Sequence, residues 1–200
     1  MIGILIPVHN EETLLGDCLE AALVAASHPG LQGEAVQILV LLDSCSDASA
    51  AIAEGFPVQR LEVQARNVGH VRGVGARHLL NQGVRWISCT DADSRVAPDW
   101  LVAQLALGAD AVCGTVTVDA WSDDFDPAAQ IRYQQAYQAR DDHRHIHGAN
   151  LGISAGAYVQ SRYRGGLADN VQTLKLKHLG VADCTVVVHQ VCMCMCRGGA

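Results

Sequence analysis

Short apolar runs alternate with segments of helical period through the first hundred residues of the chain. The runs at 2–8, 35–43, 58–63 and 84–90 have the length of strands, and each is followed by polar turn residues. Strands that alternate with helices are joined by right-handed crossovers into a mainly parallel sheet. The chain is therefore expected to be an α/β domain with helices flanking the sheet.

Three helical segments are expected between these strands. Residues 11–26 place apolar side chains on one face at helical spacing, and Asn10 precedes them as the expected N-cap. The Ala-rich segment 48–55 ends at a glycine, and residues 70–83 form the third helix.

The second half of the chain is less regular. It predicts a helix at 98–108, a strand at 109–118 and a polar helix at 127–142, and glycines then mark a turn from Gly148 to Gly156. Internal repeats, low-complexity linkers and domain boundaries are not recognisable in the sequence. The 200 residues are therefore expected to form a single domain.

Composition and charge narrow the class of protein. Half of the residues are apolar and 18% are charged, which excludes intrinsic disorder. The formal charge of −7 argues against general affinity for nucleic acid. The first apolar run is too short to span a membrane and follows no basic segment, so no transmembrane segment or signal peptide is expected. We expect a cytoplasmic protein, with peripheral contact at the inner face of the membrane left open.

Two aspartates follow the fourth apolar run. If the chain leaves this strand in an extended conformation, Asp91 and Asp93 point to the same side. Like charges so close repel each other unless a cation lies between them. The pair therefore predicts a divalent metal site. On this evidence alone the alternative is a solvated turn, with Asp93 or Ser94 capping the next helix.

Polar groups follow all four predicted strands at the same edge of the sheet, at 7–12, 41–47, 65–78 and 90–94. Ligands of parallel sheets bind beyond this edge. Asp43 is suited to accept hydrogen bonds from a base or ribose, and three basic side chains are suited to bind phosphates: Arg66, Arg72 and Arg77. A nucleotide diphosphate matches this inventory.

The order of these motifs resembles the inverting GT-A glycosyltransferases of family 2. The resemblance rests on Pro7-x-x-Asn10-Glu11, Asp43-x-x-x-Asp47, Asn67 with Gly69, Asp91-x-Asp93, and the segment HGANLGISAGAY at 147–158. It covers roughly residues 1–163. It implies a GT-A type three-layer sandwich with a mostly parallel central sheet, divided into a nucleotide-binding half (1–95), an acceptor-side half (96–163) and an atypical tail (164–200).

The resemblance also implies an activity: transfer of a sugar from a nucleotide-diphospho-sugar to an acceptor hydroxyl with inversion, assisted by Mg²⁺ or Mn²⁺. The acceptor, whether saccharide, lipid or small molecule, and the oligomeric state are left open. The implied donor-binding residues are Pro7, Asn10, Glu11, Asp43, Asn67, Arg72 and Asp91. Asp91 and Asp93 would hold the metal, with His189 as a third ligand, and the acceptor side would include His147, Gly148 and Asn150.

The chain departs from the family pattern at two places. Leu42 stands where the family often has a second acid beside Asp43, which weakens any inference about the bound base. The catalytic base usually comes from an acidic pair, and here only Asp169 matches, followed by Asn170. Asp169 is therefore the candidate base. The alternatives are a sugar-nucleotide-binding module without turnover and, less in keeping with the first loop, a nucleotidyl transferase.

Three further patterns have ordinary explanations beside functional ones. The glycines at 73 and 75 could belong to a dinucleotide loop, but they follow the third strand and lack the required spacing. The alternating histidines His143, His145 and His147 could bind Zn²⁺, and the cysteines of the tail, Cys184, Cys192, Cys194 and Cys196, could bind Zn²⁺ or Cu(I). Surface histidines and a disordered tail are the simpler readings. The remaining cysteines, Cys18, Cys45, Cys89 and Cys113, are expected to be buried thiols.

Overall fold

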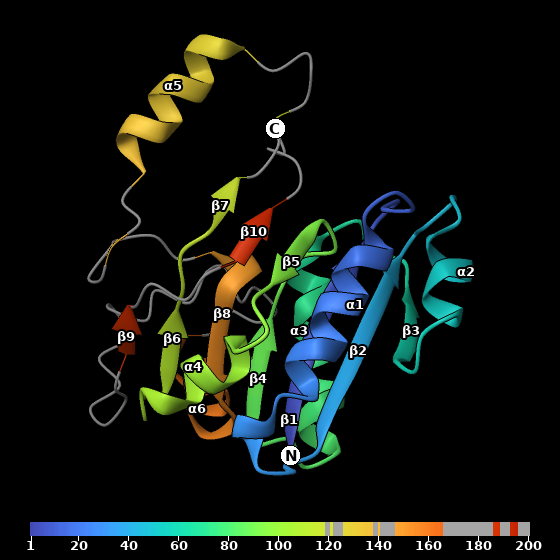
Figure 1. Cartoon of the computed structure of the whole chain (residues 1–200). Helices are drawn as coiled ribbons and strands as arrows, with labels where there is room; N and C mark the ends of the chain where they lie inside the picture. Colours follow the sequence, from blue (N-terminus) through green and yellow to red (C-terminus); the bar gives the residue numbers. More distant parts are fainter. Residues whose placement is uncertain are drawn as a thin grey trace.

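The protein, described by a computed structural model, is organised around a seven-stranded sheet in the order β3-β2-β1-β4-β8-β6-β9 (Figure 1). The structure describes residues 1–118, 121, 126–137, 140, 147–165, 186–188 and 193–195, with the backbone alone for 162–165 and the last two segments. The strands of this sheet are β1 (Ile2–Val8), β2 (Val36–Asp43), β3 (Gln59–Val63), β4 (Trp86–Cys89), β6 (Ala111–Cys113), β8 (Leu151–Ser154) and β9 (Val186–Val188).

The strands β3, β2, β1 and β4 run parallel, as the alternating pattern predicts. β1 lies between β2 and β4 and is buried along its whole length. Its side chains alternate between two cores, because Ile2, Ile4 and Ile6 face one cluster and Leu5 faces the other. A strand covered on both faces must be apolar throughout, which explains the unbroken run at the start of the sequence.

Helices cover both faces of the sheet and give three layers (Figure 1). Helices α1 (Leu15–Ala26), α2 (Ser49–Glu54) and α4 (Trp100–Ala106) pack on the face of Ile4. Helices α3 (Val68–Asn81) and α6 (Ala155–Gly165) pack on the opposite face, through residues such as Val71 and Ala157. The predicted α/β sandwich is therefore present.

Helix α1 begins later than expected. Its first residue is Leu15, and Leu14 occupies the N-cap position without a side-chain hydrogen bond. Asn10 has a left-handed backbone with φ of 56°, and it does not cap this helix, because it lies four residues before Leu14 and its Oδ1 accepts a hydrogen bond from the Ser46 amide. The predicted cap at Asn10 was wrong, although the helical face that follows was correctly identified.

Strand β8 replaces most of the turn that was predicted from the glycines. It runs antiparallel between β4 and β6, and Leu151 pairs with Cys89. Gly152 lies within this strand, where an added Cβ would approach Cδ of Gln104 to 2.9 Å. This glycine serves close packing, so its presence gave a misleading signal for a turn.

A second, three-stranded sheet follows the order β5-β10-β7. Its members are β5 (Ser94–Val96), β7 (Thr117–Val118) and β10 (Met193–Met195). β5 was not predicted, because a three-residue strand directly after the aspartates leaves too little periodicity to detect. It also means that Asp93 and Ser94 do not cap a helix, since α4 begins only at Trp100.

Helix α5 (Pro127–Ala136) begins where expected and ends before the predicted boundary at 142. The carboxylate of Asp126 caps it by accepting hydrogen bonds from the amides of Ala128 and Ala129. None of its residues is buried, and it stands away from the seven-stranded sheet in Figure 1. Within the described parts of the chain, no helix is both long and apolar enough to cross a membrane.

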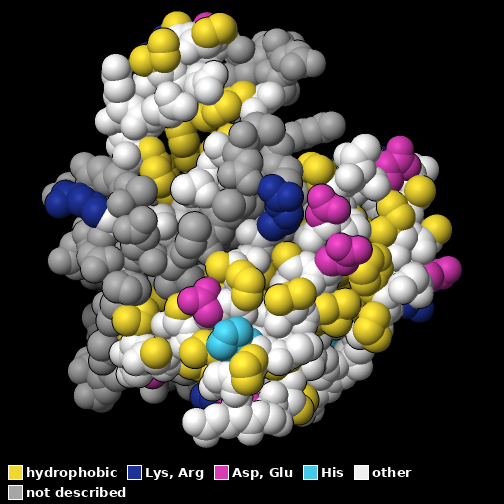
Figure 2. All heavy atoms as spheres, viewed as in Figure 1, with side chains coloured by type: hydrophobic (Ala, Val, Ile, Leu, Met, Phe, Trp, Pro, Cys, Tyr) yellow, Lys and Arg dark blue, Asp and Glu magenta, His cyan; other side chains and the backbone are white. Residues whose placement is uncertain are grey.

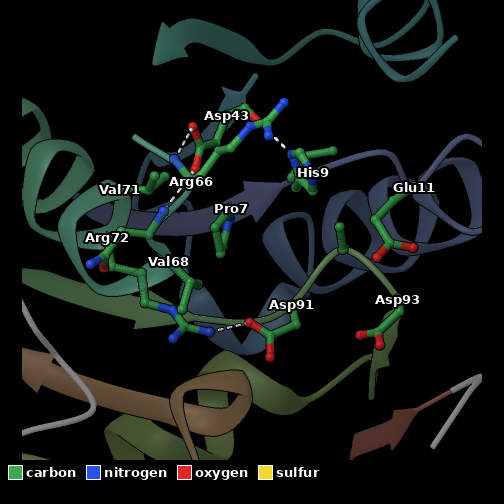
Figure 3. Close-up of a pocket in the computed structure, with 13 residues that line it drawn as sticks. Pro7, His9, Glu11, Asp43, Arg66, Val68, Val71, Arg72, Asp91 and Asp93 are labelled. Carbon is green, nitrogen blue, oxygen red and sulfur yellow. Dashed lines mark hydrogen bonds and ion pairs between the residues drawn. The ribbon is translucent and has the colours of Figure 1, made fainter. Parts of the chain in front are cut away.

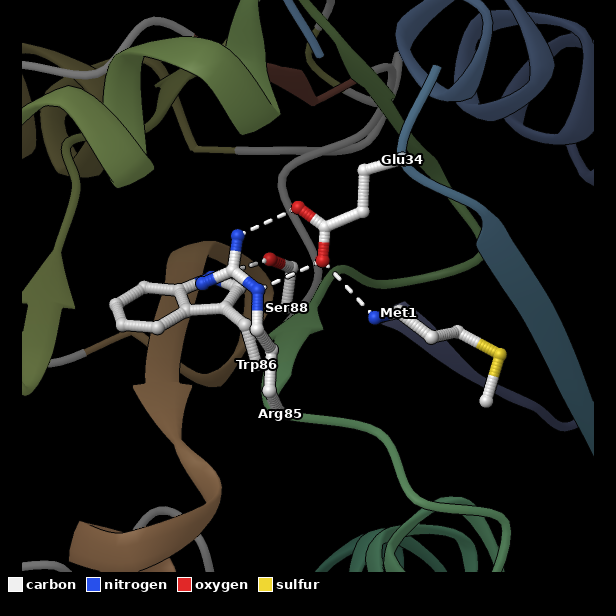
Figure 4. Close-up of polar contacts among 5 residues, drawn as sticks. All are labelled: Met1, Glu34, Arg85, Trp86 and Ser88. Carbon is white, nitrogen blue, oxygen red and sulfur yellow. Dashed lines mark hydrogen bonds and ion pairs between the residues drawn. The ribbon is translucent and has the colours of Figure 1, made fainter. Parts of the chain in front are cut away.

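An ion-pair cluster ties the amino end of β1 to the amino end of β4 (Figure 4). The Glu34 carboxylate accepts hydrogen bonds from Nε and Nη2 of Arg85, at 2.7 and 2.6 Å, and from the Met1 amino group at 2.9 Å. The hydrogen bond from Arg85 is the main cause that lowers the pKa of Glu34 to about 2. The cluster lies at the edge of the sheet opposite the polar strand ends, so it supports the fold without taking part in a site there.

Candidate functional site

A cavity of about 440 Å³ opens at the carboxyl ends of β1, β2 and β4, beside the start of α3 (Figure 3). This volume lies in the range of small-molecule sites. Its walls come from segments that are far apart in the sequence: Pro7, Val8, His9, Glu11, Asp43, Arg66, Asn67, Val68, Val71, Arg72, Asp91, Ala92 and Asp93. Most of the predicted donor-binding residues are therefore brought together. On the face of the molecule shown in Figure 2, the described basic side chains lie apart from one another and form no extended basic patch.

Asp43 holds the loop between β3 and α3. Its carboxylate accepts hydrogen bonds from the backbone amides of Ala65, Arg66 and Asn67 at 2.7, 3.0 and 3.2 Å. Burial opposes ionisation of this carboxyl group, but these amides and the Ser44 hydroxyl outweigh it and hold the pKa of Asp43 below its ordinary value. The side chain faces the cavity while it is engaged with the loop.

Replacing Asp43 with asparagine is expected to destabilise the protein by about 2 kcal/mol at neutral pH, because hydrogen bonds to a charged acceptor are lost. A lowered pKa means that this contribution is present above the ordinary aspartate pKa of about 3.9 and fades as the pH falls below it. Urea unfolding of both proteins at pH 7 and pH 3 measures the difference. Asp17→Asn, an exposed change on α1, is the control. An equal difference at both pH values would contradict the assignment.

The loops after β1 and β2 are fastened to each other. Oδ1 of Asn10 accepts a hydrogen bond from the Ser46 amide at 2.8 Å, and Oε2 of Glu12 accepts one from the Ala48 amide at 2.9 Å. In return, Asp47 accepts a hydrogen bond from the Glu12 amide at 2.9 Å. Asn10 does not line the cavity. Its hydrogen bond to Ser46 instead links the loop after β1 to the loop after β2.

Left-handed backbone conformations occur just beyond three neighbouring strands of the sheet. Asn10, Ser44 and Arg66 have φ values of 56°, 54° and 45°. Residues other than glycine adopt this region at an energetic cost and are concentrated at functional sites. The bonds made by Asn10 and Asp43 stabilise these turns, which sharply redirect the chain around the cavity.

Arg72 and Asp91 form an ion pair inside the cavity wall. Nη2 of Arg72 donates to Oδ1 of Asp91. The arginine side chain is 1% exposed, whereas that of Asp91 is 33% exposed. Nε and Nη1 of Arg72 are buried and have no hydrogen-bond partner among the described residues. Buried, unpartnered donors are costly, so this guanidinium is suited to an anion that enters the cavity.

Asp93 supplies a second carboxylate on the same side of the cavity as Asp91 (Figure 3). Burial, followed by the negative charge of Asp91, raises its pKa, although a hydrogen bond of 3.0 Å from the Ser94 hydroxyl acts in the opposite direction. A carboxylate held in such surroundings is stabilised by a cation.

The donor set fits a divalent ion that arrives with phosphates. Within the described residues, no group of three His, Cys, Asp or Glu side chains is arranged to hold a metal. Asp91 and Asp93 therefore offer two protein ligands. Mg²⁺ is commonly bound through one or two carboxylates together with water and substrate phosphates. Two carboxylates beside an anion-binding arginine match that pattern.

Two contributions to the cavity were not predicted from the sequence. His9 lines it and its Nδ1 lies 2.6 Å from the backbone oxygen of Asp43, so the ring donates through Nδ1. Val68 and Val71 form an apolar wall on the first turn of α3. His9 stands within the polar motif after β1, which was a usable signal, whereas the valines carried none. Asn67 lines the cavity and also caps α3 by accepting from the His70 amide.

None of the predicted acceptor-side residues lines this cavity, although Gly148 lies against the guanidinium group of Arg72 in its wall. Gly148 and Asn150 belong to the 3₁₀ turn η2 (Gly148–Asn150), which directly precedes β8. Asn150 is fully buried, and its side chain is bonded to Trp100 and to the backbone of Thr115. Because it is buried and already bonded, Asn150 is not in a position to contact an acceptor directly. His147 is half-buried and lies 3.3 Å, through Nε2, from the hydroxyl of Tyr137.

Several predicted residues lie outside the part of the chain that the structure describes. They are Asp169, His189, His143, His145, Cys184, Cys192 and Cys196, together with most of the tail from 164 onward. Among the other cysteines, Cys18, Cys89 and Cys113 are buried and Cys45 is half-buried. Burial raises the pKa of the Cys89 thiol to about 12, so this group beneath the aspartates is unreactive.

Arg77 differs from the other two arginines that were considered for phosphate binding. Arg66 and Arg72 line the cavity, whereas Arg77 does not. Arg77 follows Arg72 on helix α3 by little more than one turn and is half-buried. It therefore offers a matched control for experiments on Arg72.

Comparison with known proteins adds a family and a set of similar folds. The model of the family described as Glycosyl transferase family 2 matches residues 3–160. No curated protein sequence matches the chain. Among solved structures, TarS 1-349 from S. aureus in complex with UDP-GlcNAc is 12% identical, with a TM-score of 0.67 over 100% of this chain and 59% of that one.

A second similar structure is the mannosyltransferase PcManGT from Pyrobaculum calidifontis, solved in complex with GDP-Man and Mn²⁺. It is 16% identical, with a TM-score of 0.63 over 96% of this chain and 56% of that one. The chain thus spans somewhat more than half the length of these proteins. At such identities the likeness shows the fold alone, and the GT-A type fold implied by the sequence motifs is confirmed.

Proposed function

Because the chain belongs to glycosyl transferase family 2, we propose that it transfers a sugar from a nucleotide-diphospho-sugar to an acceptor hydroxyl, with inversion and with help from Mg²⁺ or Mn²⁺. The observation that carries this proposal is the convergence of Asp43, Arg72, Asp91 and Asp93 on one cavity beyond the strand ends. That edge is where parallel sheets bind nucleotides.

Each side of the cavity has a distinct task in this proposal. Asp43 and the loop that it holds would face the base, with Pro7, Glu11 and Asn67 nearby. Arg72 would bind the diphosphate through its guanidinium group, which has buried nitrogen atoms without a hydrogen-bond partner among the described residues. Asp91 and Asp93 would hold the metal ion, which would neutralise charge on the departing diphosphate. The donor half would comprise residues 1–95, and the acceptor side 96–163.

Inversion is a single displacement at the anomeric carbon. The acceptor oxygen forms a bond to that carbon while the bond from carbon to the diphosphate oxygen breaks, and the bonding electrons leave with the nucleoside diphosphate. A base must take the acceptor proton on the opposite face. Asp169 is the candidate for this step. The protein would work in the cytoplasm, with peripheral contact at the inner face of the membrane left open.

Donor binding and turnover can be tested together. The full chain is incubated with Mn²⁺ and a panel of sugar nucleotides, and both the melting temperature and the release of nucleoside diphosphate are measured. We expect one donor at a hundred times its Kd to stabilise the protein by about 2.7 kcal/mol, an effect that EDTA removes. Nucleoside diphosphate release that depends on an added acceptor supports transfer.

The second candidate function is a sugar-nucleotide-binding module without turnover. It is favoured by the sequence at the expected base, where Asp169 is followed by Asn170 and not by a second acid. Stabilisation without release, for all acceptors offered, would support it. If no sugar nucleotide stabilises the protein, with or without Mn²⁺, both candidate functions are contradicted.

A further inference from the structure

The turn η2 is fixed to the interior by a buried network of polar side chains. Oδ1 of Asn150 accepts hydrogen bonds from Nε1 of Trp100 at 2.9 Å and from Nε2 of Gln104 at 3.4 Å. Its Nδ2 donates to the backbone oxygen of Thr115 at 2.8 Å, and the Gly114 amide donates to its backbone oxygen at 2.9 Å. These bonds join the turn to helix α4 and to the segment after β6.

The network continues from helix α4 to strand β4. Oε1 of Gln104 accepts from the Ser88 hydroxyl at 2.7 Å and from Nε1 of Trp86 at 3.2 Å. The side chains of Gln104, Ser88 and Asn150 are all inaccessible to solvent. Buried and mutually bonded polar groups allow few alternative arrangements, so they fix the position of the turn that carries Gly148.

Gly148, at the start of the turn, lies directly against the guanidinium group of Arg72. A Cβ atom added at Gly148 would lie 2.6 Å from Cζ and 2.9 Å from Nη2 of Arg72. Both distances are shorter than real Cβ contacts allow. A side chain larger than hydrogen would therefore require the guanidinium group to move.

The direction in which Arg72 points depends on this contact. Its Nη2 is bonded to Asp91, but Nε and Nη1 have no hydrogen-bond partner among the described residues. The side chain is nonetheless almost fully buried. With one bonded nitrogen, the orientation of the guanidinium plane is set largely by what packs against it, and the backbone of Gly148 is part of that packing.

We infer that Gly148 is a positioning residue for Arg72, and that Asn150 anchors the turn that carries it. The segment Gly148–Asn150 then acts on the diphosphate of the donor through Arg72 and not by touching an acceptor. This inference rests on the proposed function for the role of Arg72 toward phosphate. The packing between Gly148 and Arg72 does not depend on it.

A double-mutant cycle tests the inference in the full chain. The variants are Gly148→Ala, Arg72→Ala and the combination, and the probes are UDP and GDP with Mn²⁺ in titration calorimetry. Gly148→Ala is expected to weaken binding of the nucleoside diphosphate about tenfold when Arg72 is present, and less than twofold when residue 72 is alanine. Equal losses in both backgrounds would show that Gly148 does not act through Arg72.

Unfolding provides a second readout that needs no ligand. Gly148→Ala is expected to lower the urea midpoint of the wild type but not that of Arg72→Ala, because the shortened side chain leaves room for the methyl group. If Gly148→Ala alone gives no soluble protein, adding Arg72→Ala should restore it, and continued failure contradicts the inference. Gly156→Ala, where an added Cβ meets nothing within 4 Å, should leave nucleoside diphosphate binding unchanged and should not lower the urea midpoint, because alanine favours the helix α6.

The two levels of the proposal fail in distinguishable ways. If the wild type binds neither UDP nor GDP, the proposed function is contradicted at the donor site, and the unfolding cycle still decides whether Gly148 positions Arg72. If the wild type binds a nucleoside diphosphate and the two substitutions are additive, the proposed function stands and the positioning role is wrong.

Discussion

Asp93→Asn is expected to lower the rate of glycosyl transfer at least about a hundredfold, which corresponds to roughly 3 kcal/mol of lost transition-state stabilisation. The carboxylate would be a metal ligand, and an amide oxygen without the charge binds Mg²⁺ or Mn²⁺ more weakly. The unliganded variant should be at least as stable as the wild type. Asp93 is partly buried beside Asp91, and the Ser94 hydroxyl is its hydrogen-bond partner within the described residues.

Opposite effects on activity and stability separate a ligand from a structural residue. Initial rates over a range of Mn²⁺ concentrations and urea unfolding without metal measure the two. Asp99→Asn is the matched control, because Asp99 is exposed and makes no side-chain capping bond to α4. If Asp93→Asn transfers sugar at the wild-type rate with saturating donor, Asp93 is not a metal ligand.

Arg72→Met is expected to weaken binding of the sugar nucleotide about thirtyfold, or about 2 kcal/mol, because the charge-assisted bonds to the diphosphate are lost. Methionine fills much of the same volume and removes the two buried nitrogen atoms that have no partner among the described residues. The free energy of unfolding should change little, because Asp91, which loses its ion pair, is 33% exposed and can be solvated by water. Calorimetric titration with nucleoside diphosphate and urea unfolding measure the two effects.

Arg77→Met serves as the control on the same helix, because Arg77 does not line the cavity. It should leave the affinity for nucleoside diphosphate within about twofold of the wild type. If Arg72→Met binds as tightly as the wild type, the diphosphate lies elsewhere. A comparable loss in both variants would indicate a general effect of positive charge on this helix rather than a contact at residue 72.

The parallel part of the sheet was predictable because its signal is repeated. Strands β1, β2 and β4 are apolar runs, β3 alternates polar and apolar residues, and helices of clear periodicity follow β1 and β3. The same repetition predicts that Asp43, Arg72, Asp91 and Asp93 lie at one edge of the sheet, and all four line the cavity there. Separation in sequence did not matter, because parallel strands all end on the same side.

Short elements with long-range partners were not predictable. β8 has four residues and a glycine at its second position, and it is specified by pairing with β4 and β6, whose residues are distant in the sequence. β5 pairs with β10 from the far end of the chain. Local periodicity carries no information about such partners.

Roles within the site were harder to predict than positions. Asparagine often caps helices, but the side chain of Asn10 accepts a hydrogen bond from Ser46 in the neighbouring loop. The side chain of Asn150 could bind a substrate, but in the interior Trp100 and Gln104 donate hydrogen bonds to its Oδ1. In both cases the deciding partners come from elements far along the chain, and residue type alone does not reveal them.

Strand β8 is antiparallel to β4 and β6. Its first residue therefore lies at the edge of the sheet where the cavity opens, and the residues before it reach that edge. Leu151, its first residue, pairs with Cys89 at the end of β4, and this pairing anchors the chain immediately after the turn η2. The stretch 119–146 thus enters from β7 and returns to a fixed point beside the donor cavity. Under the proposed function, substitutions in this stretch are expected to alter acceptor choice while leaving the nucleotide half unchanged.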